Sequence, residues 1–219
     1  MKRTFAQAFT LVELLIVIAL LGVIATIVIA AINPIEQANR ASDAGMKADA
    51  SQLVSAIQRY YASHNAYPWM ASTCEPNGGS FCNPVGGAGA EVQWLSADDP
   101  SVGLCGAAAP NCKSTDVQGE LVVSLELQNQ FLSKSWVNPT SATPPYQLLV
   151  GKGGSASDAV YVCWVPKSKS NRQALIDNGK MVDTTQGFQS SGAPTAGVCT
   201  LLTDADGWST GACSECVPE

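Results

Sequence analysis

An apolar run from Phe9 to Ile32, FTLVELLIVIALLGVIATIVIAAI, constrains this chain more than any other stretch. It contains one charged residue, Glu13. A helix of that length spans about 36 Å, which is enough to cross a bilayer core of about 30 Å. The run is longer than the apolar region of an ordinary secretory signal, and it does not end in a small-residue cleavage site followed by a polar segment. We therefore predict a membrane-spanning helix over residues 9–32.

Glu13 is the residue of this helix that needs an explanation, because a carboxylate near the bilayer core costs about 2.5–3.5 kcal/mol. It lies one helical turn after Phe9. A cut between Ala8 and Phe9 would create a positively charged α-amino group at the start of the helix. Glu13 could then pair with that amine or with the amine of a neighbouring chain. The alternative is that Glu13 lies close enough to the interface to reach headgroup water.

The residues around this run carry a family resemblance. A short leader with two basic residues, MKRTFAQA, ends in the small residue Ala8 and is followed by FTLVELLIVIALLGVIA. This pattern resembles the class III signal of type IV pilins and of type II secretion pseudopilins. The one departure is Ala8 itself, because the family usually has glycine at that position.

The resemblance implies that prepilin peptidase removes residues 1–8 on the cytoplasmic side and that the new Phe9 amine is N-methylated. It also implies that Glu13 and Phe9 set the register of the helices in a filament of this chain, alone or with other pilins. Lys2 and Arg3 agree with this topology, since positively charged flanks stay cytoplasmic. We expect a single-pass protein of the cytoplasmic membrane that pilus assembly machinery then transfers into an extracellular filament on the cell surface.

Residues 33–66 are expected to continue the helix as an amphipathic half. Asn33-Pro34 predicts a kink or local break, because proline disfavours a helical conformation in the residue before it. Five residues then recur at spacings of four and three and predict one buried face: Met46, Ala50, Leu53, Ile57 and Tyr60. The charged residues of this half lie off that face: Arg40, Asp43, Lys47, Asp49 and Arg59.

Residues 67–219 are expected to form one extracellular globular domain. Residues 71–119 are rich in Gly, Ala, Pro, Asn and Ser and predict a connecting loop, with a short strand or helical turn at 91–95. We predict a short helix around Leu125–Leu132, a helical turn at 172–178, and a sheet in the region 145–202. Its strands are predicted at Tyr146–Val150, Ala159–Val165 and Val198–Leu202, and a Gly/Ser-rich loop joins the first two as a hairpin. The expected fold class is α+β, type IV pilin-like, with the long helix packed on a small antiparallel sheet.

The chain has eight cysteines, and all of them follow the helical half. An even number in this arrangement predicts an oxidising, extracytoplasmic compartment and up to four disulfides. Local bridges such as Cys74–Cys82 and Cys105–Cys112 would pin the loop region, and a third strand beside the hairpin would bring Cys199 within reach of Cys163. Spacing does not fix the pairing, so all eight are candidates: Cys74, Cys82, Cys105, Cys112, Cys163, Cys199, Cys213 and Cys216.

Two further motifs have alternative interpretations. Cys213 and Cys216 have the spacing of a redox pair or half a zinc site, but disulfide staples fit the compartment better. Asp204 and Asp206, followed by glycine, form either an Asx-rich turn or the opening of a calcium loop. Major pseudopilins resemble this chain in having a C-terminal calcium loop, so calcium is the one cofactor that the sequence suggests.

Composition argues against some partners and activities. The formal net charge is −6, and removal of the leader makes the chain more acidic, so the body is not suited to non-specific nucleic-acid binding. The short basic run at 166–172 is expected to be a solvated loop, with a DNA-contact patch as the alternative. The chain has a single histidine and no nucleophile-elbow sequence, and we expect no catalytic site.

We therefore predict a structural subunit, a major or minor pilin, of a type IV pilus-like filament. The nearest alternative is a type II secretion pseudopilin, which would form a short periplasmic pseudopilus. An alternative of another class is an extracellular thiol, redox or other enzyme that keeps the helix as a membrane anchor; a reactive Cys213/Cys216 pair would favour it.

Overall fold

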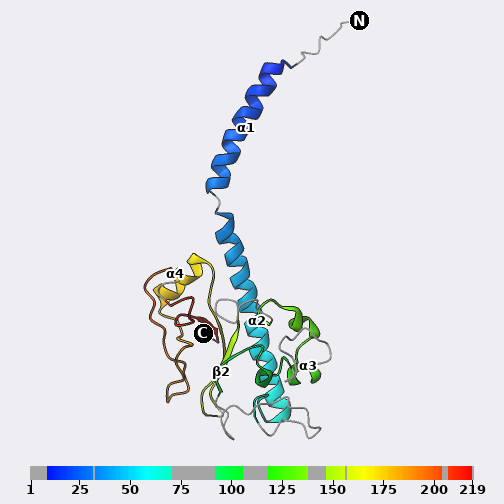
Figure 1. The fold of residues 1–219 in the computed structure, drawn as a ribbon, viewed down its shortest axis with the longest axis vertical. Helices are drawn as coiled ribbons and strands as arrows, with labels where there is room; N and C mark the ends of the chain where they lie inside the picture. The colour runs from blue at the N-terminus through cyan, green and yellow to red at the C-terminus, as the bar shows by residue number, and fades with distance from the viewer. Residues whose placement is uncertain are drawn as a thin grey trace. The chain divides into compact units, whose positions relative to one another are not determined.

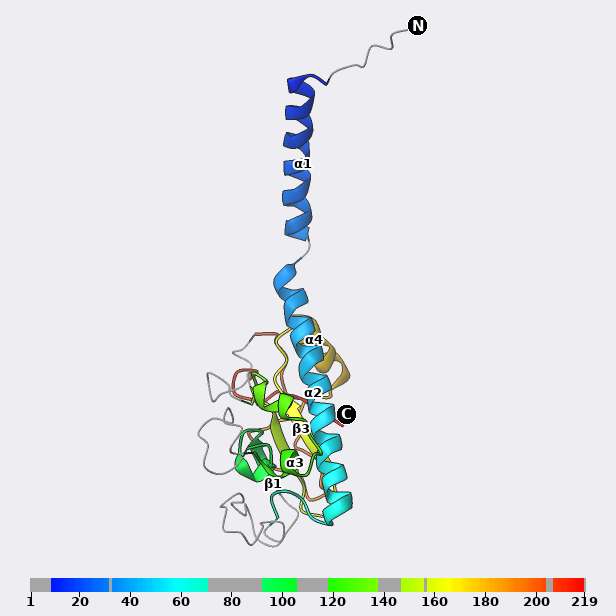
Figure 2. The same cartoon turned by 90° about the vertical axis from the view of Figure 1, so that its right-hand side faces the viewer.

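The computed structural model describes residues 9–31, 33–70, 92–105, 118–137, 147–155, 157–203 and 207–218. The chain forms two compact units, residues 1–39 and residues 40–219 (Figures 1 and 2). The second unit contains a small antiparallel sheet together with helices, so the predicted α+β class is confirmed.

Two consecutive helices, α1 (Leu11–Ala31) and α2 (Pro34–His64), occupy the N-terminal part of the chain. The predicted break at Asn33-Pro34 is confirmed, because one helix ends before it and the next begins at the proline. Proline suits the first position of a helix, where its missing N–H would have no helical partner. The Asn33 side chain accepts a hydrogen bond of 3.3 Å from a backbone N–H in the first turn of α2 and caps that helix.

The apolar face predicted for α2 is the face that the second unit buries. Ala50, Leu53 and Ile57 are fully buried, and Tyr60 is nearly so. They belong to one hydrophobic core with side chains of the sheet and of the loops, and Met46 packs against this core from its edge. The helical spacing of the apolar residues therefore identified the core side of α2 correctly.

Two aspartates that lie off this apolar face, Asp43 and Asp49, are nevertheless buried. The Asp49 carboxylate accepts hydrogen bonds from the indole N–H of Trp136 at 2.8 Å and from the ammonium of Lys134 at 3.0 Å. Asp43 accepts backbone N–H groups of Lys167 at 2.8 Å and of the following residue at 2.9 Å. The buried surface of α2 is thus wider than its apolar stripe. Beside the stripe, the two carboxylates accept hydrogen bonds from segments that are distant in the sequence.

The sheet has four antiparallel strands in sequence order. They are β1 (Val92–Ser96), β2 (Leu149–Lys152), β3 (Val160–Trp164) and β4 (Glu215–Val217). The predicted hairpin is confirmed, with Val150 opposite Val162 in its ladder. The described part of the segment at 91–95, which was ambiguous in the sequence, belongs to strand β1, and β2 begins later than predicted.

Two predicted elements are wrong. Val198–Leu202 is not a strand; the strand that follows the hairpin in the sheet is β4, close to the chain end. The helix expected around Leu125–Leu132 is also absent. In its place the chain forms α3 (Glu120–Val123), a turn, and a 3₁₀ helix at Asn129–Ser133. Leu125 has a φ of 63°, which ends the helix before the predicted span begins.

A ten-residue helix, α4 (Lys169–Asn178), covers a second, smaller core that contains Trp208. Ser168 is its N-cap, and the serine side chain accepts the backbone N–H of Asn171 at 3.3 Å. Gly179 ends it in the left-handed conformation with φ 63°. Asp43 of α2 lies against the start of α4, where its negative charge also favours the helix dipole.

We predict that Asp43→Ala lowers the free energy of unfolding by about 3 kcal/mol, because it leaves two backbone N–H groups at the start of α4 without their acceptor. Asp177→Ala is the matched control, since Asp177 is an exposed aspartate of α4 itself. Its effect should stay within about 0.5 kcal/mol. Urea unfolding of the full chain in detergent measures both. Equal effects of the two substitutions would contradict the role given to Asp43.

Candidate functional site

The first turn of α1 is closed by a reciprocal pair of side chains, Thr10 and Glu13. The Glu13 carboxylate accepts the backbone N–H of Thr10 at 3.0 Å and the Thr10 hydroxyl at 2.9 Å. In return, the Thr10 hydroxyl oxygen accepts the backbone N–H of Glu13 at 3.2 Å. This arrangement is a capping box, in which two N–H groups at a helix start are satisfied by the two side chains.

The capping box gives Glu13 a structural role before any partner is present. Both bonds to Glu13 end on one carboxylate oxygen, Oε2. In the described part of the chain the other oxygen, Oε1, accepts no hydrogen bond, so this carboxylate can still take a further donor. Sequence reasoning missed this pair, although T-x-x-E before an apolar run is its signature and stands in TLVE.

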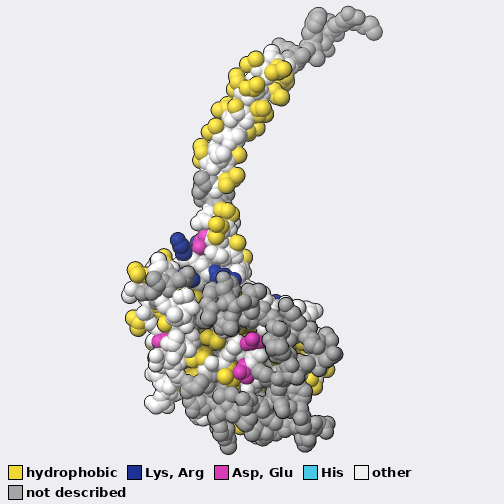
Figure 3. Space-filling view, in the orientation of Figure 1, with side chains coloured by type: hydrophobic (Ala, Val, Ile, Leu, Met, Phe, Trp, Pro, Cys, Tyr) yellow, Lys and Arg dark blue, Asp and Glu magenta, His cyan; other side chains and the backbone are white. Residues whose placement is uncertain are grey.

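The rest of α1 has an apolar surface on all sides. Its large side chains are about half to four-fifths exposed, and Phe9, just before the helix, is 83% exposed. Figure 3 shows hydrophobic side chains along the whole visible face of α1. Leu11–Ile29 is long and apolar enough to cross a membrane. A surface of this kind requires either lipid or other helices around it.

The structure pairs four of the candidate cysteines. Cys163 of β3 bonds to Cys216 of β4, directly opposite in the ladder, and Cys199 bonds to Cys213. The prediction that Cys199 lies within reach of Cys163 is therefore wrong. The place beside β3 that was predicted for Val198–Leu202 is taken by β4. Cys105 is also disulfide-bonded. Cys74, Cys82 and Cys112 lie outside the described residues.

The two cysteines of the C-terminal CxxC sequence do not bond to each other. Cys213 and Cys216 each have a different partner, and both are buried. A dithiol redox centre needs an exposed thiolate that can exchange with its neighbour. In this structure the motif instead ties the C-terminal segment to β3 and to the segment around Cys199, and no described cysteine is free.

The calcium candidates Asp204 and Asp206 lie outside the described residues. Across the described residues, no group of three or more His, Cys, Asp or Glu side chains could hold a metal ion. Glu215, the next acidic residue in the sequence, forms an ion pair of 3.1 Å with Lys47 of α2. The calcium interpretation therefore stays a prediction from the sequence.

The basic run at 166–172 is not the solvated loop that the sequence predicted. Arg172 is 7% exposed, its guanidinium donates to the carbonyl oxygens of Pro166 and Leu202, and it lies 5.2 Å from the ring of Trp208. This arginine joins α4 to the second core. A DNA-contact patch that includes Arg172 would need this buried network to open.

Lys152 in β2 is a fully buried ammonium group in the second unit. It donates to the carbonyl oxygen of Gly153 at 3.3 Å and to that of Ser155, and it lies 5.2 Å from the ring of Tyr67. Burial lowers the pKa of Lys152 below its ordinary value, and burial likewise raises the pKa of Tyr67. Because the ammonium donates hydrogen bonds to these carbonyl oxygens, it holds the hairpin loop in place and is not arranged as a nucleophile.

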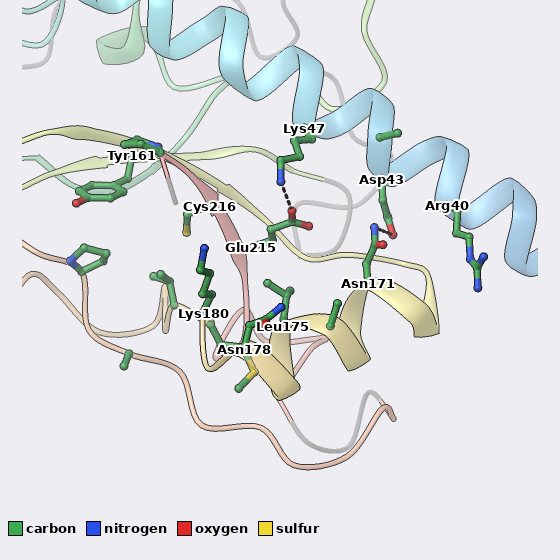
Figure 4. Close-up of a pocket in the computed structure, with 17 residues that line it drawn as sticks. Arg40, Asp43, Lys47, Tyr161, Asn171, Leu175, Asn178, Lys180, Glu215 and Cys216 are labelled. Carbon is green, nitrogen blue, oxygen red and sulfur yellow. Dashed lines mark hydrogen bonds and ion pairs between the residues drawn. The ribbon is translucent and has the colours of Figure 1, made fainter.

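A groove of about 640 Å³ opens between α2, α4 and the strands β3 and β4. Figure 4 shows Lys47 directed at Glu215 and Asp43 at Asn171 across one side of it. The other lining residues are mostly apolar, and they include Ala44, Ala174, Leu175, Met181 and Val182. The groove lies wholly within the second unit.

One comparison with known proteins gives a match. Residues 3–29 match the family model of the prokaryotic N-terminal methylation motif. The comparisons with curated proteins and with solved structures find no match. The matched segment contains the leader's basic residue Arg3, the capping box and most of α1.

The matched motif and the exposed apolar helix define a class of protein, namely precursors that carry a class III signal peptide. The matched segment is similar to the class III signal that precursors of type IV pilins and pseudopilins carry.

We predict that Thr10→Val weakens the start of α1 by about 1 kcal/mol, because valine has the shape of threonine without the capping oxygen. Amide hydrogen exchange of residues 10–14 in detergent should become about fivefold faster. Thr10→Ser keeps the hydroxyl and should exchange like the unchanged chain. Equal rates in the valine and serine variants would contradict the capping box.

Proposed function

We propose that this protein is the structural subunit of a type IV pilus-like filament. Cleavage between Ala8 and Phe9 releases the mature chain, and Phe9 is then N-methylated. The observation that carries the proposal is the methylation motif over residues 3–29, which coincides with an apolar helix whose single carboxylate is held at its first turn. The helices would form the filament core, and the disulfide-bonded units would form its outer surface.

Glu13 has the contacts needed for a second, intermolecular role. Its Oε2 serves the capping box, which leaves Oε1 to accept a donor from another chain. Cleavage before Phe9 would supply that donor as a positively charged amine four residues before Glu13. An amine and a carboxylate that meet inside an apolar bundle neutralise each other, whereas either one alone would be costly there. Pairing would therefore favour one register between helices over others.

The second unit is suited to exposure outside the cell. Two disulfides hold its C-terminal half together, and such bonds persist in oxidising compartments. This location agrees with a cytoplasmic leader and an outward-facing body on either side of one membrane span. The partners proposed are other copies of this chain or related pilins, prepilin peptidase with its methyltransferase activity, and the pilus assembly machinery.

We predict that the N-terminal peptide of protein recovered from sheared surface material begins at N-methylated Phe9. Mass spectrometry of that peptide makes the measurement, with the whole-cell precursor as the reference. A start at Met1, or beyond residue 32, would show that the helix is an anchor or an ordinary signal and would refute the filament proposal. A methylated start found only in the periplasm would favour a pseudopilin.

Two substitutions separate the capping role of Glu13 from its charge. Glu13→Gln keeps an oxygen that can accept the Thr10 N–H, and Glu13→Ala keeps neither the cap nor the charge. We predict that both variants insert into the membrane, yet both are depleted from filaments when expressed beside the unchanged chain. The measurement is the ratio of variant to unchanged subunit in filaments and in membranes. Normal incorporation of the glutamine variant would show that capping, and not charge pairing, is what assembly requires.

A further inference from the structure

A polar hollow of about 380 Å³ lies at the surface of the second unit and shares no lining residue with the groove at α4. Two loops form it, the hairpin loop between β2 and β3 and the turn at 188–194. Its volume falls within the range of about 300–1,000 Å³ that is usual for small-molecule sites. Hydroxyl, amide and carboxylate groups line it beside one aromatic ring: Ser155, Asp158, Phe188, Gln189, Ser190 and Ser191.

The Asp158 carboxylate is fixed between the two loops. One of its oxygens, Oδ2, accepts the backbone N–H of Ser155 at 2.9 Å. Gly153 and Gly192 lie so close to this carboxylate that a Cβ at either position would overlap it, and the φ of 79° at Gly192 also favours glycine. In the described part of the chain the other oxygen, Oδ1, accepts no hydrogen bond, so it can receive a donor from a bound molecule.

Both loops are held in place before any ligand binds. In the hairpin loop, the buried Lys152 ammonium donates to the carbonyl oxygens of Gly153 and Ser155. In the turn, the Gln189 side-chain amide donates to the carbonyl oxygen of Pro194 at 3.1 Å. Groups that are already ordered lose less conformational freedom when a ligand binds, which favours affinity.

Several polar groups of the hollow are not used within the subunit. The Ser190 and Ser191 side chains are exposed, and their hydroxyls make no hydrogen bond among the described residues. The Gln189 amide uses its N–H on Pro194 and keeps its oxygen as an acceptor. Together with Oδ1 of Asp158, these groups offer donors and acceptors at several points around one hollow.

Phe188 adds a fixed aromatic ring to this polar lining. The ring is half-buried and stacks on Trp94, with centroids 4.8 Å apart. Gly151 of β2 makes room for the stack, because a Cβ there would lie 2.8 Å from the tip of the Phe188 ring and 2.6 Å from the Trp94 ring. Aromatic faces carry partial negative charge, so the weakly positive C–H groups of a sugar ring pack favourably on them.

The charge of the hollow excludes several classes of ligand. Asp158 is the single charged residue among the described lining, so a phosphate or carboxylate compound meets no cation there. Burial lowers the pKa of Lys152, and the charge of Asp158 partly offsets this effect, so the carboxylate already has a cation close by. A metal ion lacks ligands, since no described group of three suitable side chains exists. The hollow therefore favours a neutral ligand with many hydroxyl groups.

We propose that this hollow binds a hexose ring of a neutral saccharide. Asp158 and Gln189 accept hydrogen bonds from sugar hydroxyls, the two serine hydroxyls donate or accept further ones, and Phe188 packs against the C–H face of the ring. The inference does not depend on the proposed filament function, because every residue that it uses lies in the second unit.

Saturation-transfer difference NMR of the full chain tests the site. The probes are glucose, galactose, mannose and N-acetylglucosamine, each titrated to tens of millimolar, and the detergent must have no sugar headgroup. We expect saturable binding of one or more of these sugars. The uronic acid of the sugar that binds should bind about tenfold more weakly or worse, because Asp158 repels a second carboxylate.

Two leucine substitutions locate the binding. Ser191→Leu fills the hollow with an apolar side chain. Gln186→Leu is the matched control, because Gln186 is an exposed residue just before the same turn and does not line the hollow. Neither original side chain makes a hydrogen bond within the described structure, so both variants should keep the melting temperature of the unchanged chain. We expect Ser191→Leu to abolish the saturable signal and Gln186→Leu to retain it.

Three outcomes would overturn the proposal. One is the absence of a saturable signal from all four sugars. Another is equal binding by the two leucine variants, which would place the sugar elsewhere on the chain. The third concerns Asp158→Asn, which keeps an oxygen for the Ser155 N–H and removes the charge. This variant should bind the uronic acid almost as well as the neutral sugar, and continued rejection of the acid would contradict a contact with Asp158.

Discussion

The second unit depends on carboxylates that α2 carries into its interior. Asp43 receives the backbone N–H groups that precede α4, and Asp49 receives the indole of Trp136 and the ammonium of Lys134. Hydrophobic burial along Ala50, Leu53 and Ile57 drives collapse but does not by itself choose which loop lies where. Buried carboxylates do make that choice, because each is costly unless its particular donors are present. The segment before α4 and the segment around Trp136 are therefore positioned on α2 by polar contacts on either side of its apolar stripe.

The same logic applies at the start of α1, where a single carboxylate lies at the edge of a wholly apolar helix. Glu13 is useful to the precursor because it closes the first turn with Thr10. Only one of its oxygens is used for this purpose, so the proposed pairing with a mature N-terminal amine adds a partner and does not break the cap. Cleavage would change the charge beside Glu13 and leave the fold of the helix as it was. The proposed processing step would thus add a charged partner for Glu13 without refolding the helix.

The spacing of apolar residues and the positions of proline and glycine predicted the parts of the fold that depend on local sequence. The break at Pro34, the buried face of α2 and the β2–β3 hairpin follow from spacing, proline geometry and a glycine-rich loop. The wrong assignments at Val198–Leu202 and around Leu125 have tertiary causes. The position beside β3 is taken by the short strand β4, whose disulfide from Cys216 to Cys163 cannot be inferred from spacing. The roles of Asp43 and Arg172 were equally hidden, because their partners lie far away in the sequence. The capping box, by contrast, could have been recognised from the sequence, because its T-x-x-E pattern is local.

An apolar helix such as α1 cannot set the geometry of a filament alone. Lipid tails and neighbouring helices are similarly apolar, so transfer from one to the other provides little specificity. Register must come from packing and from the few polar or shaped features at defined points of the chain. Glu13 is such a feature at the start of α1. In the proposed filament, pairing of Glu13 with a mature N-terminal amine would supply the register that apolar packing alone leaves open.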